Sequence, residues 1–295
     1  MGDWRGLLEG ERARDVELLD RALGLRLSGQ AYAEALLDPR GHLFQRLEYV
    51  GDSILDVVVV QALVRLEPWT EASLGLVNDE QQALVSDHAL GKVAARRGLP
   101  DVRTFAASRH RLADRIEAAI GAAWADAGID AAEAVAVRLV VEPGLHGVPP
   151  RAGVPEAAPD EAYETASRVC GHDPVEHAWF GAAAAGGPAR RRLAVLGNAV
   201  LEAALATAQY ADEPEATEAQ LSEERRTATS NAVIAARAAE LGLVSPQDLD
   251  DRRGLADEAQ ALVGAALLDG GITAGLQVAC GVLGRRCAPG PVVEP

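Results

Sequence analysis

Apolar residues in the first third of the chain recur at intervals of three and four positions. The clearest case is segment 47–63, where other apolar residues also fill the remaining faces. This spacing predicts a helix, and a helix that is apolar on nearly all sides is typical of a domain centre. The residues that follow the spacing are Leu47, Val50, Ile54, Val57, Val58 and Gln61.

Two later segments show the same helical period. Segment 72–99 predicts one or two helices that end at Gly98, and segment 110–128 predicts another that ends at Gly128. No segment shows the alternation of apolar and polar residues that is typical of a β-strand. The sequence therefore predicts an all-α fold.

The chain also repeats itself. Three blocks of the first half recur in the second half, in the same order and at a nearly constant separation, which indicates duplication of a whole domain. The paired blocks are 46–56 with 192–202, 83–99 with 227–243, and 112–128 with 255–271.

Composition shifts between the repeats suggest where the domains end. Prolines and glycines after residue 140 oppose regular structure, so we expect a linker there. The predicted organisation is a first domain at 1–140, a linker at 141–160, a second domain at 161–286 and a loose tail at 287–295.

The formal net charge of −16 argues against a generic nucleic-acid binder, because phosphate contacts need positive charge. A local basic surface remains possible, and the arginine run 190–192 is one candidate, with a solvated helix end as the alternative. The three cysteines, an odd number, suggest reduced thiols. With no secretory signal and no apolar stretch long enough to cross a membrane, we expect a cytoplasmic protein.

Four acidic residues suggest a metal site. Glu48 and Asp52 stand four positions apart on one predicted helix, and Asp114 and Glu117 stand three apart on another, so each pair shares a helix face. If the two faces meet, the carboxylates would repel one another unless cations bind, and hard ions such as Mg²⁺, with Mn²⁺ as a substitute, prefer oxygen ligands. The alternative is that each pair belongs to an ordinary solvated face.

These blocks resemble the ribonuclease III family. "FQRLEYVGDSILD", "ALVSDHALG" and "ADRIEAAIGAAWAD" occur in the order and at the separations of the family's three signature helices. The resemblance implies a helical domain that works in pairs and cuts double-stranded RNA to leave a 5′-phosphate and a 3′-hydroxyl. It also implies that Glu48, Asp52, Asp114 and Glu117 are the catalytic, metal-binding carboxylates. An earlier family acid falls on Gln45.

The second repeat departs from this pattern, because the four positions read Ala194, Asn198, Asp257 and Gln260. One acid of the four survives, so we expect no catalytic metal there. The prediction is an intramolecular pseudo-dimer of two ribonuclease III-like domains with a single active centre, in the first.

The predicted function is hydrolysis of phosphodiesters in double-stranded or structured RNA by a Mg²⁺-dependent endoribonuclease. Two alternatives stay open: a metal-dependent enzyme that acts on a small molecule, and a non-cleaving RNA-binding or assembly protein on the same fold. We see no double-stranded-RNA-binding domain after the second repeat, so a protein partner that delivers RNA is possible, as is further homo-oligomerisation.

Overall fold

The computed structural model describes residues 10–66, 72–99, 109–145, 177–243 and 251–286. Within these ranges every regular element is a helix, which confirms the all-α prediction. The chain divides into two compact units. Unit 1 comprises Met1–Val58, Gln82–His146 and Gly290–Pro295, and unit 2 comprises Val59–Gln81 and Gly147–Pro289.

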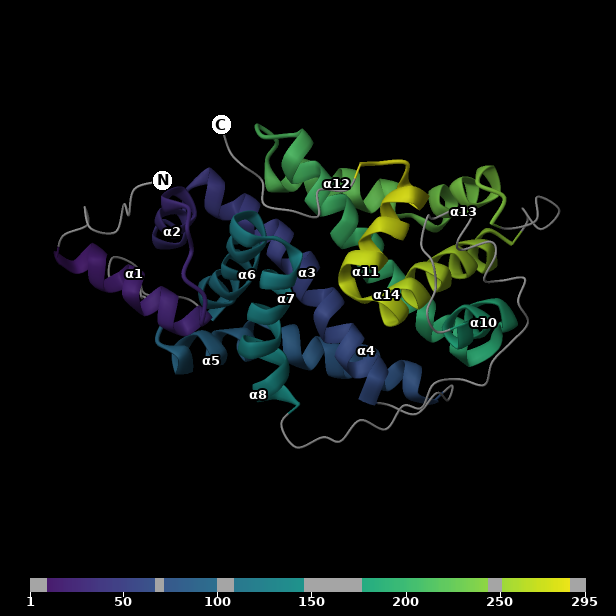
Figure 1. The fold of residues 1–295 in the computed structure, drawn as a ribbon, viewed down its shortest axis with the longest axis horizontal. Coiled ribbons are helices and arrows are strands. Elements are labelled where there is room, and N and C mark those ends of the chain that lie inside the picture. Colours follow the sequence, from purple (N-terminus) through teal and green to yellow (C-terminus); the bar gives the residue numbers. More distant parts are fainter. Residues whose placement is uncertain (1–9, 67–71, 100–108, 146–176, 244–250, 287–295) are drawn as a thin grey trace. The chain divides into compact units, whose positions relative to one another are not determined.

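In unit 1 helices α3 and α6 meet backbone to backbone, and the shorter helices α2, α5 and α7 pack against α6 (Figure 1). The long helix α3 begins in unit 1, and its last eight residues, from Val59, belong to unit 2. The helices of this part of the chain are α1 (Gly10–Leu23), α2 (Gln30–Leu37), α3 (His42–Leu66), α4 (Ala72–Val85), α5 (Asp87–Arg97), α6 (Arg109–Ala127), α7 (Ile129–Ala136), a π-helical turn (Val137–Val141) and α8 (Glu142–Gly144).

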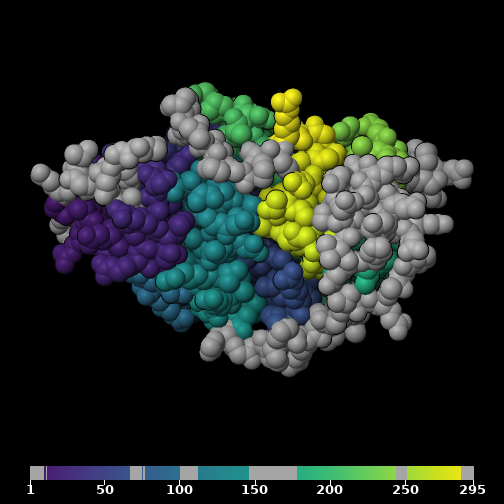
Figure 2. Space-filling view, viewed as in Figure 1, coloured from purple at the N-terminus to yellow at the C-terminus, as the bar shows by residue number. Residues whose placement is uncertain are grey.

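Unit 2 is built around α11 and α14, which pack extensively along each other. Side chains fill the spaces that the ribbon leaves between the helices of each unit (Figure 2). The helices of the second half are α10 (His177–Ala185), α11 (Gly187–Asp212), α12 (Glu218–Ala228), α13 (Asn231–Glu240) and α14 (Arg252–Leu283).

The helices repeat in the same order as the sequence blocks. The first signature block lies on α3 and again on α11, the second spans α4–α5 and again α12–α13, and the third lies on α6 and again on α14. Even the break after the third block recurs, because Gly128 and Gly271 both have a left-handed φ, of 88° and 77°. The duplication read from the sequence is therefore a duplication of helical architecture.

The predicted helix ends are confirmed. Segment 72–99 forms two helices that divide at Ser86, whose side chain accepts a hydrogen bond from the backbone N–H of Ala89. Gly98 ends the second of them in a left-handed conformation, which glycine adopts at low cost. Helix α6 ends at Ala127, directly before Gly128.

Glycines let the central helices of each unit touch backbone to backbone. A Cβ atom built on Gly51 of α3 would lie 1.8 Å from the carbonyl oxygen of Glu117 in α6, and one on Gly121 would lie 1.9 Å from that of Leu47. In unit 2 a Cβ on Gly197 would lie 1.7 Å from the carbonyl oxygen of Gln260. Only glycine fits these positions, so the mid-helix glycines of the signature exist for close packing.

Arg192 is buried at 1% exposure in unit 2. Its guanidinium donates to the carbonyl oxygens of Val64, at 3.3 Å, and Leu63, at 3.5 Å, near the end of α3. The last carbonyls of a helix have no partner within the helix, and a buried cation can satisfy them. This arginine is therefore part of the core of unit 2.

Two expectations from the sequence were wrong. The 32-residue helix α14 is long and apolar enough to cross a membrane by composition, although 61% of its apolar window is buried inside the protein, as in a core helix. Cys280 forms a disulfide, whereas three reduced thiols were expected. Three cysteines can form one disulfide and leave one thiol, so the odd count did not exclude a disulfide. The other two cysteines lie outside the described residues.

The predicted domain boundaries stay predictions. Most of the linker at 141–160 and the whole tail at 287–295 lie outside the described residues, and Glu142–Gly144 at the start of that linker forms a helical turn.

Candidate metal centre

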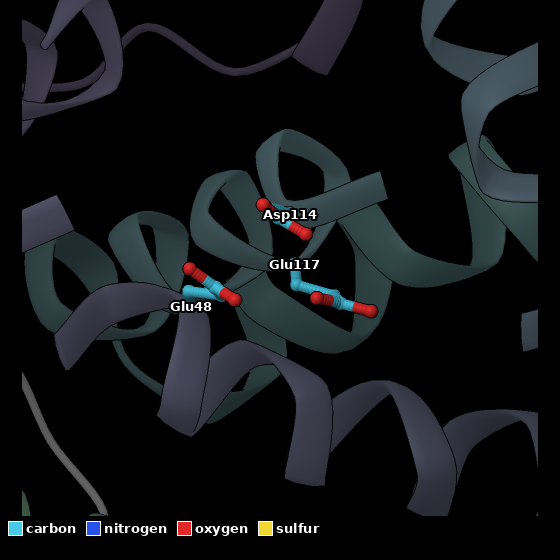
Figure 3. Close-up of side chains that lie close together, drawn as sticks. All are labelled: Glu48, Asp114 and Glu117. Atoms are coloured by element: carbon cyan, nitrogen blue, oxygen red, sulfur yellow. The ribbon is translucent and has the colours of Figure 1, made fainter. Parts of the chain in front are cut away.

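The structure brings acidic side chains of α3 and α6 together in unit 1. One carboxylate oxygen from each of Glu48, Asp114 and Glu117 lies within 4.8 Å of the others. Figure 3 shows Glu48 reaching from α3 toward the two acids of α6. All three side chains are partly buried. Three oxygen donors at this separation can converge on one hard cation.

Backbone packing sets this geometry. Gly51 lies three residues after Glu48 on α3, and its missing side chain lets α6 approach at the carbonyl group of Glu117. The apolar side chains around the acids, Leu47, Val50 and Ile116, are fully buried. The carboxylates are thus held against an apolar core by the same contact that joins the helices.

The carboxyl group of Glu117 has a strongly raised pKa. Burial is the largest cause that raises its pKa, to about 9, and the negative charges of Asp52, Glu48, Asp114 and Asp87 raise it further. A carboxyl group with this pKa carries a proton at neutral pH when no cation is near. A divalent cation at the same place would displace that proton, because it would offset the negative charges that now surround Glu117.

Asp52 belongs to this electrostatic neighbourhood but not to the group of three. It is the strongest charged influence on Glu117, yet its carboxylate is not among those within 4.8 Å. It stands one helical turn beyond Glu48 on α3, partly buried. The structure therefore places three of the four predicted residues together and the fourth nearby. Gln45, where the family has an acid, is exposed.

Asp87 was missed by reasoning from the sequence. It is the first residue of α5, exposed, and close enough to raise the pKa of Glu117. A signal was present in the repeat, because the position that matches Asp87 in the second half is Asn231. The charge is lost there together with the charges of the matching acids, as expected for a residue that belongs to the same site.

The corresponding place in unit 2 is held by neutral amides. The side-chain amide of Gln260 donates to Asn198 Oδ1 at 3.1 Å, and the amide of Asn198 donates to Glu202 Oε1 at 2.9 Å. Ala194, which matches Glu48, is buried at 5% exposure. Gln260 and Asn198 share one hydrogen bond, where the matching acids of unit 1 repel each other.

The comparisons with known proteins follow the same division of the chain. Residues 45–128, which carry the carboxylate group, match the ribonuclease III domain. A relative from Leifsonia xyli called ribonuclease 3 is 33% identical over 159 residues, which are 49% of this chain and 64% of that protein. Another ribonuclease 3, from Dinoroseobacter shibae, is 36% identical over 104 residues, 32% of this chain and 44% of its own.

Solved structures resemble a larger part of the chain. The crystal structure of Dicer from Giardia intestinalis covers 86% of this chain and 56% of its own, at 17% identity and a TM-score of 0.58. A second structure of Giardia Dicer covers 84% and 55%, with a TM-score of 0.60. At this identity the likeness concerns the fold, and it reaches across both halves of the repeat.

The matched regions span about half the length of these curated relatives, or somewhat more, so the family assignment concerns the domain. The domain match, the relatives and the duplicated helical fold agree with the signature blocks quoted above. Residues 45–128 are therefore similar to the ribonuclease III domain, and the helical fold across both repeats is similar to that of Giardia Dicer.

Proposed function

We propose that this protein is a Mg²⁺-dependent endoribonuclease that hydrolyses phosphodiesters of double-stranded RNA at a single active centre in unit 1. The observation that carries the proposal is the group of Glu48, Asp114 and Glu117, whose carboxylate oxygens lie within 4.8 Å of one another inside the matched domain. The relatives named ribonuclease 3 support the reaction class.

The donor set fits a hard divalent ion. All the side chains that converge are carboxylates, and burial with like charges raises the pKa of Glu117 to about 9, which is the mark of a site built for a cation. Glu48, Asp114 and Glu117 would hold the ion directly, with Asp52 beside them. A bound ion would polarise the phosphodiester and lower the pKa of a water molecule. Mn²⁺ has similar ligand preferences and is the expected substitute.

The chain's own side chains would prepare the site in two ways. Their negative charge repels a bare phosphodiester, so RNA can approach closely only when the cations are present. The apolar core beneath Glu48 and Glu117 keeps the carboxylates partly dehydrated, which strengthens their attraction for a cation. Both effects make cleavage depend on the divalent ion.

A single active centre follows from the second repeat. Asn198 and Gln260 carry no charge, and Ala194 offers no ligand atom, so Asp257 is the only acid of the quartet in unit 2. One protein molecule bound once to a duplex should cut one strand and leave a nick.

The test is single-turnover cleavage of a short RNA duplex with each strand labelled separately, in Mg²⁺ and in EDTA. We expect one strand to be cut first and only with Mg²⁺, and Glu117→Gln to abolish cutting. Asp130→Asn, which removes an exposed charge at the start of α7, is the control and should cut like the wild type. Equal cutting of both strands by a monomer would refute the single centre.

The alternatives are outcomes of the same test. The small-molecule alternative requires an enclosed pocket beside the carboxylates. Metal binding at unit 1 without cleavage of any RNA would favour that alternative. RNA binding without cleavage or metal binding would favour the non-cleaving assembly protein. We further propose a cytoplasmic location, which fractionation of the native cells would test.

A further inference from the structure

Arginines gather around the degenerate centre of unit 2. Asp257 is the acid that survives there, and burial is the main cause that raises its pKa, with Asp251 adding to the rise. Arg253, Arg190 and Arg191 are near enough to act in the opposite direction. In unit 1 the charged groups that shift the pKa of Glu117 are all acids.

Helix geometry places these arginines on the face that is acidic in unit 1. Arg190 and Arg191 precede Ala194 by one turn of α11, and Arg253 precedes Asp257 by one turn of α14. Residues three and four apart lie on the same side of a helix. The guanidinium of Arg190 lies 3.9 Å from Glu258, the neighbour of Asp257, so this turn of α11 faces the turn of α14 that carries Asp257.

The arginines are specific to the second repeat. The positions that match Arg190 and Arg191 are Phe44 and Gln45, and the position that matches Arg253 is His110. Unit 2 has lost acids inside the centre and has arginine at these three positions, while unit 1 has Arg111 three residues before Asp114.

These side chains differ in how firmly they are held. Arg190 is anchored, because its Nε donates to the carbonyl oxygen of Ala183 at 2.7 Å and its Nη1 lies 3.9 Å from Glu258. Arg191 and Arg253 are exposed. Arg192, the remaining member of the run, is buried and cannot contact a ligand at the surface. The predicted basic run is therefore divided between the core and the surface.

We propose that Arg191 and Arg253, beside the anchored Arg190, form a phosphate-binding site where unit 1 carries its carboxylates. Guanidinium groups match the geometry of phosphate oxygens and bind them through paired hydrogen bonds. The neutral amides of Asn198 and Gln260 add no negative charge, while Asp257, Asp251 and Glu258 remain close to the arginines. The ligand is a backbone phosphate of duplex RNA, and this identification rests on the function proposed above.

The site would divide two tasks between the repeats. The acidic centre of unit 1 depends on cations and repels phosphate without them, whereas the arginine site of unit 2 binds phosphate with no metal present. It also explains how a chain with a net charge of −16 holds RNA, because the positive charge is concentrated where the substrate lies.

The experiment measures binding of a labelled RNA duplex to the full chain in EDTA by fluorescence anisotropy, over a range of salt concentrations. Each lost phosphate contact should reduce the slope of log K against log salt by about 1, so Arg191→Gln with Arg253→Gln should reduce it by about 2. The matched control removes two other exposed arginines of unit 2, Arg226 and Arg285, which are paired with Glu223 and Glu224. The control should keep the wild-type slope.

A second readout uses inorganic phosphate and the melting temperature of the same proteins. Phosphate should raise the melting temperature of the wild type and the control, and not that of the arginine variant. An unchanged salt slope in the arginine variant, or an equal loss in the control, would overturn the site while leaving the proposed nuclease intact. A wild type that binds no RNA but keeps the arginine-dependent phosphate shift would overturn the nuclease and leave the anion site. A wild type that neither binds RNA nor gains stability with phosphate would overturn both the proposed nuclease and the arginine site.

Discussion

The two repeats share one frame and carry opposite chemistry. In each, a pair of long helices crosses at glycines that admit backbone contact, Gly51 with Gly121 and Gly197 with Gly264. The side chains that surround the crossing differ. This contrast shows that the fold depends on the glycines that allow backbone contact at the crossing. The chemistry depends on a few nearby side chains, which can change without disturbing that contact.

The difference has an energetic consequence. The amides of unit 2 satisfy one another through the 3.1 Å hydrogen bond between Gln260 and Asn198, so that centre is stable without a ligand. In unit 1 the matching residues, Glu117 and Asp52, repel each other and share their surroundings with further acids. That centre needs either protons or a cation. Five experiments, from the largest expected effect to the smallest, test the comparison.

The largest effect should be on cleavage. Glu117→Gln keeps the shape of the side chain but removes a ligand charge, so we expect the single-turnover rate on duplex RNA to fall by about 100-fold or more. The matching change in unit 2, Gln260→Ala, should leave the rate unchanged. A comparable loss from both changes would show that the two centres act together, and circular dichroism would confirm that both variants are folded.

Alanine at the crossing glycines should damage both units alike. A Cβ at Gly51 or Gly197 would overlap a carbonyl oxygen of the facing helix, and backbone atoms cannot move aside cheaply. We expect each substitution to reduce the free energy of unfolding by about 3 kcal/mol in urea denaturation. Gly75→Ala on α4, where a Cβ would meet nothing within 4 Å, is the control. It should stabilise the protein slightly, by up to about 1 kcal/mol.

The stability of unit 1 should depend on pH in EDTA. Because the pKa of Glu117 is about 9 in the folded protein against 4.5 for the ordinary group, the folded state keeps a proton that the unfolded state loses between these values. Stability should therefore fall as pH rises from 4.5 to 9. Glu117→Gln should remove this contribution and melt at a higher temperature than the wild type at pH 8.

Addition of Mg²⁺ should reverse that order. The cation stabilises the ionised carboxylates, so the melting temperature of the wild type should rise, while that of Glu117→Gln should change little. If Mg²⁺ shifts both proteins equally, Glu117 is not a ligand.

The smallest effect concerns the amides of unit 2. A double-mutant cycle with Asn198→Ala and Gln260→Ala should give a coupling free energy of about 1 kcal/mol in urea denaturation, since their side chains share one partly buried hydrogen bond. The cycle should give the same value in Mg²⁺ and in EDTA. A coupling that depends on Mg²⁺ would mean that unit 2 still binds a cation.

The sequence by itself determined the helical class, the duplication and three members of the acidic group. Helical period, glycine at helix ends and the recurrence of three blocks are local properties, and they suffice to place Glu48 on one helix and Asp114 with Glu117 on another. The loss of charge at Asn198 and Gln260 was equally visible, because it needs only an alignment of the chain with itself.

Tertiary structure decided what depends on distance between helices. The approach of α6 to α3 at Gly51 sets which carboxylates converge, separates Asp52 from the group of three and raises the pKa of Glu117 through burial. The tertiary structure also places Asp87, the first residue of α5, close enough to raise the pKa of Glu117. It divided the arginine run as well: Arg192 reaches the end of α3, whereas Arg191 stays exposed. No local pattern reports such facts, because they arise from contacts between segments that are distant in sequence.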